Sequence, residues 1–310
     1  MAENRYLSVN PPRRIAAYAR LLKINVPELS LYPLISFGLT AVHIQEARYW
    51  LINSGFLLFV FCCSALSISL DDLNGYIDGV DRLDTLNTKR NITKPLLTGE
   101  LEQSDVRRAA ACAVLLGCLL LVLVSTQTRY PAISVLLMVA LMLYSAQYSA
   151  GLKLSYRGLG EVVLMLGIPA SICLPVWLLA GSVPPGAIMV AAMMGLPYAA
   201  QIVISNLIDH DGDKDAGRLT LTIVMGPKRA AALLPAFLLA TFWMIWLAGF
   251  YWHILPRLAI CWIALLPLHV RYIALIRNSR YADARLLSFK GIRFKLLLVT
   301  VSTLLAGIAL

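Results

Sequence analysis

Acidic residues are scarce in this chain: Asp and Glu together account for 17 of the 310 residues, against 27 Lys and Arg. Charged residues of both signs make up only 14% of the sequence, whereas 59% is apolar and the mean hydropathy is +0.73. This balance lies well outside the range of ordinary soluble domains. The scarcity of charge therefore indicates an integral membrane protein.

Cysteine and histidine form no recognisable metal or redox pattern. The chain has six Cys and four His, with no Cys-x-x-Cys pair and no Cys/His grouping, so neither a disulfide framework nor a zinc site is expected. The first residues are polar and lack a signal-peptide core, so we expect the first span to serve as its own insertion signal. The cysteines fall in apolar stretches, where we expect them to pack: Cys62, Cys63, Cys112, Cys118, Cys173 and Cys261.

Long apolar stretches predict an all-α membrane protein with about nine transmembrane helices. A spanning helix needs roughly 20 mostly apolar residues. A turn at Gly-Ser-Val-Pro-Pro-Gly (181–186) divides the longest stretch in two. In the last span, Lys290, Arg293 and Lys295 would have to extend to the interface. The predicted spans are 24–45, 49–70, 109–128, 130–152, two within 162–208, 230–256, 258–276 and 289–310.

Basic residues are concentrated on one side of this predicted bundle. The polar N-terminus (1–20), Lys23, the loops after spans 2, 4 and 6, and the segment 271–295 around the loop after span 8 together hold 24 of the 27 Lys and Arg. Such a bias places these segments in the cytoplasm, and a bacterial inner membrane is the expected location. The net charge of +10 thus reflects membrane topology, and nucleic acid is not an expected partner.

Nine of the 17 acidic residues fall in two short windows, Asp-Asp-Leu-Asn-Gly-Tyr-Ile-Asp-Gly-Val-Asp-Arg-Leu-Asp (71–84) and Asp-His-Asp-Gly-Asp-Lys-Asp (209–215). Each window follows the cytoplasmic end of an even-numbered span, the second and the sixth. The offset of four spans suggests a pseudo-repeat, with halves of roughly 21–155 and 156–280 inside a single domain, 1–310. The two acidic clusters would then lie at matching places.

The spacing within each cluster favours a metal–phosphate site. Side chains at i, i+3 and i+7 share one face of a continuing helix, where carboxylates repel each other unless a cation lies between them. Hard oxygen ligands favour Mg²⁺, which binds through one or two carboxylates plus substrate phosphates. A solvated loop is the plain alternative for one cluster alone, but two matched clusters argue against it. These faces carry Asp71, Asn74, Asp78 and Asp81 in the first cluster, and Asn206, Asp209 and Asp213 in the second.

Basic side chains near the clusters are candidates for binding phosphate oxygens. The positive-inside bias alone can explain any single one of them. Those within the aspartate loops are the better candidates. They are Lys89, Arg90 and Lys94 after the first cluster and Lys214 after the second; Arg218, Lys153 and Arg157 also lie nearby in the cytoplasmic loops.

The second cluster resembles a motif of the UbiA superfamily of intramembrane prenyltransferases. In Asn-Leu-Ile-Asp-His-Asp-Gly-Asp-Lys-Asp-Ala-Gly-Arg-Leu-Thr-Leu (206–221), two Asp four residues apart precede an Ala-Gly pair and Thr220, without a gap. The stretches Lys-Pro-Leu-Leu-Thr-Gly-Glu-Leu (94–101) and 148–161 are similar to the family's loops after the first motif and after the fourth span. With about nine spans in the expected order, the resemblance covers nearly the whole chain.

The first cluster departs from the family's pattern of Asn-Asp, then Asp three residues later and Asp four after that. One register aligns Asp71, Asn74 and Asp78 with the family's carboxylates. The other aligns Asp71 and Asp72 with Asn-Asp and leaves Gly75 where an Asp belongs. Both registers stay open. The candidate metal ligands are therefore Asp71, Asp72, Asn74, Asp78, Asp81, Asp209 and Asp213.

The resemblance implies a helical bundle around a cavity, with a cytoplasmic cap formed by the loops after helices 2 and 6. It also implies Mg²⁺-dependent transfer of a prenyl group, from a prenyl diphosphate to an aromatic or quinone-precursor acceptor within membrane lipid. Expected catalytic residues are Asp71, Asp78, Asp209, Asp213 and Lys94. Expected substrate contacts are Asn74, Lys89, Arg90, Lys153, Arg157, Asn206, Lys214 and Tyr148.

Other side chains have two interpretations each. Tyr144, Tyr148 and Tyr198 could offer a π face to a carbocation or belong to an interfacial aromatic belt. Glu161 could act in the site or pair with Arg157 four residues earlier; Glu28 and His210 are similar cases. Two alternative functions remain: a membrane terpene cyclase that needs no acceptor, and a cation transporter. The transporter is disfavoured because both clusters lie at helix ends rather than near mid-membrane.

Overall fold

The computed structural model is an all-helical bundle, described over residues 11–24, 26, 29–41, 46–81, 94–252 and 266–306. In these ranges the one extended pairing is an isolated bridge between Arg157 and Leu219. The helices are α1 (Pro11–Leu21), α2 (Leu34–Leu39), α3 (Ala47–Ile77), α5 (Gln103–Ser125), α6 (Pro131–Ala146), the 3₁₀ turn η3 (Leu154–Tyr156), α7 (Gly160–Ala180), α8 (Pro185–Ile208), α9 (His210–Asp215), α10 (Leu221–Met225), α11 (Pro227–Trp252), α13 (Leu266–Arg277) and α14 (Tyr281–Ala306).

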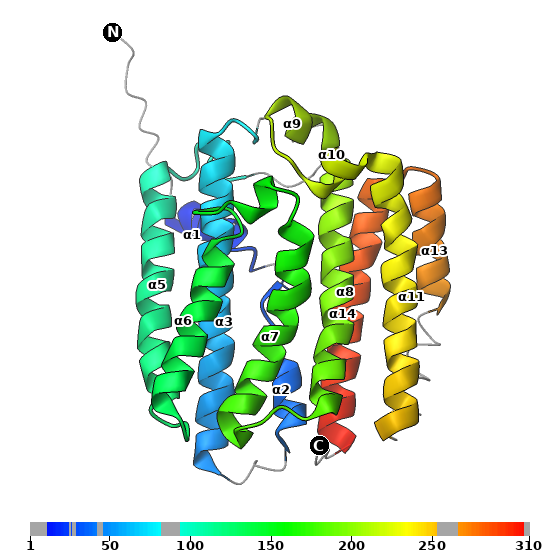
Figure 1. Ribbon diagram of the computed structural model, residues 1–310. Helices are drawn as coiled ribbons and strands as arrows, with labels where there is room; N and C mark the ends of the chain where they lie inside the picture. Colours follow the sequence, from blue (N-terminus) through cyan, green and yellow to red (C-terminus); the bar gives the residue numbers. More distant parts are fainter. Residues whose placement is uncertain are drawn as a thin grey trace.

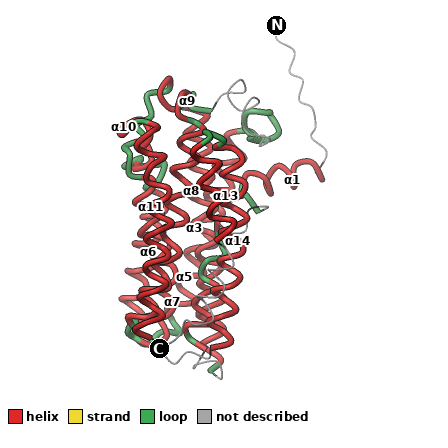
Figure 2. The backbone as a smooth tube through the Cα atoms, turned by 90° about the vertical axis from the view of Figure 1, so that its right-hand side faces the viewer, coloured by secondary structure: helices red, strands yellow, loops and turns green. Residues whose placement is uncertain are grey.

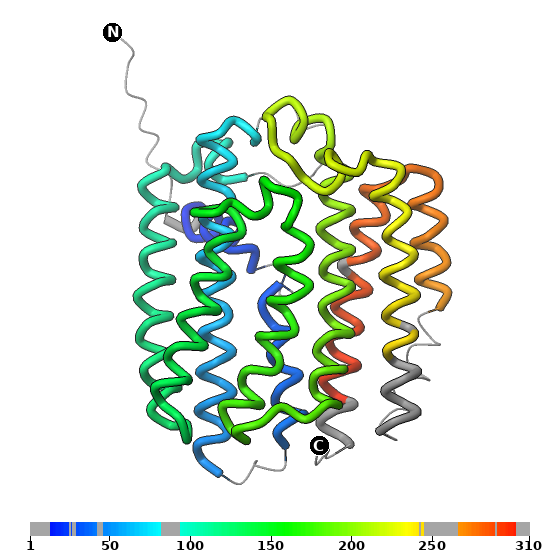
Figure 3. The backbone as a smooth tube through the Cα atoms, in the orientation of Figure 1, coloured from blue at the N-terminus to red at the C-terminus, as the bar shows by residue number. Residues whose placement is uncertain are grey.

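The long helices stand side by side, and the short helices α9 and α10 gather at one end of the bundle (Figure 1). The end of α3, the start of α7 and the end of α8 lie at this same end, as the chain trace also shows (Figure 3). Helix α1 lies across the bundle rather than along it (Figure 2). Ala17 and Leu21 of α1 pack against Leu73 of α3, and α1 is further held by Arg14, which donates to Asp105 at 2.5 Å.

Within the described residues, four helices are long and apolar enough to cross a membrane: α3, α5, α7 and α8. Helix α6 is apolar but shorter, with 16 residues. The turn predicted at 181–186 is confirmed, because α7 ends at Ala180 and α8 begins at Pro185. Proline suits the first helical position, where its missing N–H would have no helical partner. The protein is therefore a multi-pass integral membrane protein.

The first predicted span differs from the structure. In the described part of 24–45, only Leu34–Leu39 is α-helical, and turns precede it. Pro33 directly precedes this short helix as its N-cap; proline lacks the N–H that a longer helix would need and disfavours a helical residue before it. The predicted span 258–276 lies partly outside the described residues, and its observed helix is α13.

Helix α3 is longer than a membrane span. Its 31 residues correspond to about 46 Å, roughly 16 Å more than a bilayer's hydrocarbon core. The apolar part ends at Leu70, so the excess length carries Asp71 and the following polar residues past the apolar part of the bundle. Sequence and length together place the first acidic cluster at the bundle end that also holds α9.

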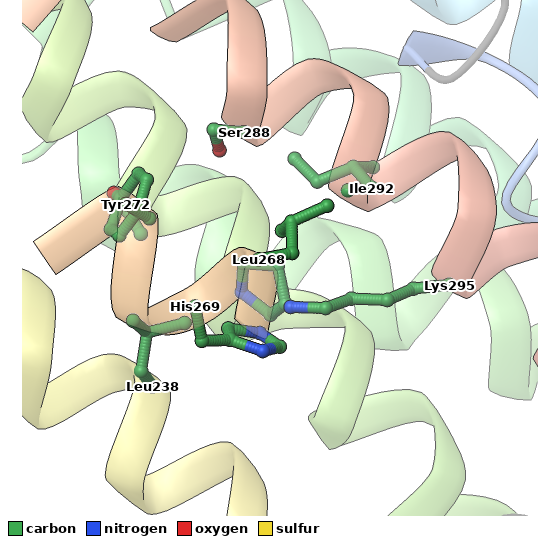
Figure 4. Close-up of a pocket in the computed structure, with 10 residues that line it drawn as sticks. Leu238, Leu268, His269, Tyr272, Ser288, Ile292 and Lys295 are labelled. Carbon is green, nitrogen blue, oxygen red and sulfur yellow. The ribbon is translucent and has the colours of Figure 1, made fainter. Parts of the chain in front are cut away.

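Lys295 of α14 does not extend to the interface as expected. Its side chain is 4% exposed and points into a small pocket between α8, α11, α13 and α14 (Figure 4). His269 and Tyr272 of α13 and Ser288 of α14 line the same pocket, so the lysine lies beside polar side chains rather than lipid. Lys290 and Arg293 are exposed.

Candidate active site

One side of the first acidic cluster faces the loop after α6. The Ser149 hydroxyl donates to Asp71 at 2.6 Å, and the Asn74 amide donates to the Ser149 carbonyl at 2.6 Å. Asp78, which ends α3, accepts from the Lys153 ammonium at 2.7 Å. Three side chains at i, i+3 and i+7 thus share one face, as their spacing predicts.

The other side of the same helix end forms a separate ion-pair cluster. Lys94 Nζ lies 3.0 Å from Asp72 Oδ1 and 2.5 Å from Asp81 Oδ2, and all three side chains are largely buried. Gly75 makes room for this approach, because a Cβ there would collide with the Asp81 carboxylate. Burial alone would lower the pKa of Lys94, but Asp72, Asp81 and Asp71 outweigh it and raise that pKa. Lys94 therefore remains charged.

The second cluster does not continue one helix. Helix α8 ends at Ile208, the helical backbone is interrupted at Asp209, and α9 follows. The backbone N–H of Asp213 donates to the Asp209 carbonyl at 2.8 Å. Asp and Gly are weak helix formers, which explains an interruption in this stretch. Asn206 and Asp213 therefore come from two helices, which corrects the single face expected from their spacing.

The polar residues of this cluster differ strongly in burial. Asp213 is 2% exposed, whereas Lys214 of the same short helix is exposed. Deeper in α8, the Asn206 amide donates to Glu161 Oε1 at 2.8 Å. Glu161 at the start of α7 thus pairs with Asn206, while Arg157, the partner considered from sequence, is exposed. This bond ties the start of α7 to the end of α8 directly beside the second cluster.

Arg218 connects the two acidic clusters. Its guanidinium lies 3.8 Å from Asp71 Oδ1 at the end of α3 and 3.9 Å from Asp213 Oδ1 in α9. The side chain is 14% exposed, and burial alone would lower its pKa; Asp71 and other anionic neighbours raise it instead. The expected convergence of the two helix ends is thus present in the structure, with a cation between one carboxylate of each.

The loop after α6 fixes the direction of Arg218. The guanidinium donates to the Ser155 hydroxyl at 3.1 Å and lies over the Tyr156 ring, 4.5 Å from its centroid. The Leu219 N–H also donates to the Tyr156 carbonyl at 3.1 Å, which joins this loop to the segment after α9. Three segments far apart in the sequence therefore meet around one side chain.

Tyr148 lies at the edge of this arrangement. Burial and the nearby carboxylate of Asp71 raise the pKa of its phenol, so the hydroxyl stays protonated near neutral pH. Its ring lies against the start of α7, where a Cβ on Gly160 would be 3.4 Å from Tyr148 Cε2. Among the tyrosines singled out from sequence, Tyr148 is the one beside the charged groups.

The remaining candidates lie elsewhere. Tyr198 packs edge-on against Tyr32 in the core, with ring centroids 5.7 Å apart. The Tyr144 hydroxyl donates to the Val163 carbonyl at 3.0 Å. Lys89 and Arg90 (in 82–93) and Glu28 lie outside the described residues.

Four residues of the site were not predicted as such: Ser149, Ser155, Tyr156 and Arg218. The sequence indicated Arg218 as one of several nearby basic residues, but Lys214 was the better candidate for binding phosphate. The serines and Tyr156 lie in a stretch similar to a family loop, and hydroxyl groups there follow no spacing that would single them out. These side chains belong to the site only because their loop meets the segment that carries Arg218.

The donor chemistry of the site fits a hard divalent cation. The carboxylates of both clusters converge on cationic side chains, Asp72 and Asp81 on Lys94, and Asp71 and Asp213 on Arg218. Oxygen ligands of this kind suit Mg²⁺. Over the described part of the chain, however, no three Asp, Glu, His or Cys side chains are close enough to hold a metal unaided. Phosphate oxygens of a substrate would have to complete the coordination.

Known proteins resemble this chain in sequence and in fold. Residues 31–299 match the UbiA prenyltransferase family. The 1,4-dihydroxy-2-naphthoate octaprenyltransferase of Escherichia coli (strain K12) is 28% identical over 171 residues. That alignment covers 53% of this chain and 54% of the relative, about half of each.

Solved structures share the fold over nearly the whole chain. A UbiA homologue from Archaeoglobus fulgidus bound to GPP and Mg²⁺ aligns with a TM-score of 0.57 at 19% identity, covering 91% of this chain and 99% of the other. The apo UbiA homologue from Aeropyrum pernix K1 gives a TM-score of 0.67 at 14% identity, with 90% and 97% covered. From its sequence match and its fold, the chain belongs to the UbiA prenyltransferase family.

Proposed function

We propose that this protein transfers a prenyl group from a prenyl diphosphate to an aromatic quinone precursor, in a reaction that requires Mg²⁺. The observation that carries the proposal is Arg218, which lies between Asp71 and Asp213 and so joins the two acidic helix ends at one place. The GPP and Mg²⁺ bound to the Archaeoglobus homologue support a prenyl diphosphate and this metal. The name of the Escherichia coli relative supports a hydroxynaphthoate-like acceptor.

The membrane arrangement belongs to the same proposal. One domain, 1–310, would cross the membrane about nine times as two pseudo-repeat halves, and the site would lie on the cytoplasmic side of a bacterial inner membrane. The loops after α3 and α8 would form its cap. The excess of Lys and Arg in the segments at this end supports that orientation.

Metal ligands would come from the α3 face that is directed at the second cluster. Asp71, Asn74 and Asp78 share this face, and Asp71 also shares Arg218 with Asp213. This favours the first of the two registers, with Asp72 and Asp81 holding Lys94 instead. Asp209 and Asp213 would supply ligands from the second cluster. Bound Mg²⁺ would neutralise diphosphate charge and stabilise the leaving group.

The chain's own cations would bind and orient the diphosphate. Arg218 is held about 4 Å from two carboxylates, a spacing that would leave the N–H groups not bonded to Ser155 available to phosphate oxygens. Lys153 lies at the rim beside Asp78 and could reach the same anion. Lys89, Arg90, Lys214 and Arg157 would add positive charge around the entrance. Such fixed charges stabilise the negative charge that builds up as the leaving group departs.

The reaction breaks the allylic C1–O bond, and both electrons leave with the diphosphate. A ring carbon of the acceptor then forms the new C–C bond to C1, and the ring loses a proton to regain aromaticity. The Tyr148 ring, which lies beside the charged groups, would offer its π face to the allylic cation. Apolar helices below the charged groups would exclude water, which would otherwise capture that cation.

The test uses purified full-length protein in lipid nanodiscs, labelled geranyl diphosphate and Mg²⁺, with and without 1,4-dihydroxy-2-naphthoate. We expect a prenylated naphthoate only with the acceptor, no product after chelation of the metal, and recovery when Mg²⁺ is restored. A cyclised hydrocarbon formed without acceptor would instead identify a cyclase. Absence of any diphosphate release would overturn the proposal.

A further inference from the structure

Helix α1 lies across the bundle and is attached to the beginning of α5 (Figure 2). Arg14 of α1 donates to the Asp105 carboxylate of α5 at 2.5 Å. The buried side chains of Ala17 and Leu21 belong to an apolar cluster that also contains Val106 of α5. These contacts fix α1 at the level of the first turn of α5, which begins at residue 103.

This level is the boundary between the charged and the uncharged part of α5. All charged residues of that helix lie between positions 103 and 108, and the rest of the helix, 109–125, carries no charge. Helix α5 is long and apolar enough to cross a membrane. The charges that flank a spanning helix lie where the hydrocarbon ends and the headgroups begin. The bundle therefore holds α1 in the plane of the membrane interface.

The outward side of α1 combines an apolar side chain with cations. Ile15 is 71% exposed, and its neighbours Arg13 and Arg14 are exposed as well. Helices that lie in the headgroup layer show this combination, because the apolar side chain enters the acyl boundary while the cations stay among the lipid phosphates. The surface of α1 thus suits contact with lipid.

The first turns of α5 add two exposed arginines beside α1, Arg107 and Arg108. Arg108 lies 3.0 Å from Asp105, the carboxylate that also binds Arg14. Because Asp105 is only 2% exposed, it offers almost no carboxylate surface that would repel an anion. Within the described residues, Arg13 and Arg107 have no acidic partner, so both guanidinium groups are available to an anion outside the protein.

The corner formed by α1 and residues 100–108 carries an excess of positive charge. Arg20 pairs with Glu100, and Glu102 accepts from the Ser104 hydroxyl at 3.3 Å within the capping box that begins α5. With Asp105, this corner has three carboxylates against five guanidinium groups, which leaves two positive charges in excess. The five arginines are Arg13, Arg14, Arg20, Arg107 and Arg108.

We propose that this corner binds anionic phospholipids, with α1 in the headgroup layer and its exposed arginines on the lipid phosphates. The proposal uses none of the residues assigned to prenyl transfer and is independent of that reaction. Arginine forms paired N–H···O contacts with phosphate oxygens, and an anionic membrane surface attracts each cation near it. Zwitterionic lipid has the same phosphate, but its ammonium group cancels the charge, so selectivity for anionic lipid is the property to be measured.

The test measures lipid binding to the purified full-length protein by native mass spectrometry, with phosphatidylglycerol or phosphatidylcholine. The double variant Arg13→Gln/Arg107→Gln removes the two cations without an acidic partner. Arg129→Gln is the matched control, because Arg129 is an exposed arginine beyond the opposite end of α5. We expect the affinity for phosphatidylglycerol to fall at least about fivefold in the double variant and to stay within about twofold of wild type in the control.

Two results would overturn the proposal. One is a wild-type protein that binds both lipids equally, and the other is an equal loss of phosphatidylglycerol affinity in the double variant and in the control. The substituted side chains are exposed, so we expect both variants to melt like wild type in phosphatidylcholine.

A second measurement needs no variant. Backbone hydrogen exchange would be followed in phosphatidylcholine nanodiscs with and without phosphatidylglycerol. We expect peptides from 11–21 to exchange at least about threefold more slowly with the anionic lipid, because a helix held by lipid opens less often. The turn at 126–130, beyond the opposite end of α5, should exchange equally in both. Unchanged exchange in α1, or equal slowing at both places, would contradict a lipid site at this corner.

Discussion

Lys94 and Arg218 each lie between two carboxylates, but their surroundings differ. Lys94 contacts Asp72 and Asp81 at 3.0 and 2.5 Å, and all three residues belong to the segment that ends and follows α3. Arg218 stands 3.8 and 3.9 Å from Asp71 and Asp213, which belong to different helices. We propose that the short contacts form a structural ion-pair cluster and that the longer ones leave a cation able to exchange partners with an incoming anion.

The largest effect on turnover should come from removing a carboxylate beside Arg218. Asp213→Asn should lower prenyl transfer at least about 10²-fold, the scale of losing one group that stabilises a transition state electrostatically. The matched control is Asp215→Asn, an exposed aspartate of the same short helix, which should stay near wild-type activity. Equal activity of both variants, measured with labelled geranyl diphosphate, would remove Asp213 from the site.

Arg218→Gln should have the next largest effect on turnover. Without the guanidinium, the diphosphate loses a charge-assisted contact, and we expect turnover to fall about tenfold to 100-fold. The fold should persist, because Ser149 still donates to Asp71. Thermal unfolding within a few degrees of wild type, together with the lost turnover, would support this assignment. A variant with full activity would show that Arg218 has only a structural role.

Lys94→Gln should chiefly affect stability. Removing one partner of a buried ion pair leaves the other charge uncompensated, at a cost of about 3 kcal/mol. We therefore expect a clearly lower midpoint of thermal or denaturant unfolding. This decrease should be larger than the decrease for Arg218→Gln. If Lys94→Gln unfolds like wild type but loses turnover, the contrast between the two cations is reversed and Lys94 belongs with the substrate contacts.

Lys214→Gln should produce the smallest change. The side chain is exposed on α9, and a single surface charge contributes little. We expect less than a twofold change in turnover at physiological ionic strength. A loss comparable to that of Arg218→Gln would mean that α9 turns Lys214 inward when substrate binds.

Sequence alone predicted those parts of this molecule that depend on local composition. The spans within 49–208 followed from apolar length, because a membrane forces backbone groups to pair within helices. The convergence of the two clusters followed from their common position at even-numbered helix ends. Both arguments use only the order of residues along the chain.

The remaining features depend on contacts between distant segments. Arg218 is directed inward because Leu219 pairs with Tyr156 in the loop after α6, and no pattern near Arg218 reveals that pairing. Lys295 turns inward because polar residues of α13 lie beside it. The interruption at Asp209 left Asp213 in a separate helix, which spacing alone could not anticipate.

The central claim is that both acidic helix ends grip one diphosphate, and a double-mutant cycle tests it most directly. The affinity for geranyl diphosphate with Mg²⁺ would be measured for wild type, Asp71→Asn, Asp213→Asn and the double variant. Shared binding predicts that the double variant binds hardly more weakly than either single one, a coupling of at least about 1 kcal/mol. If the affinity losses of the two single variants simply multiply in the double variant, the two helix ends bind independently, which contradicts the account.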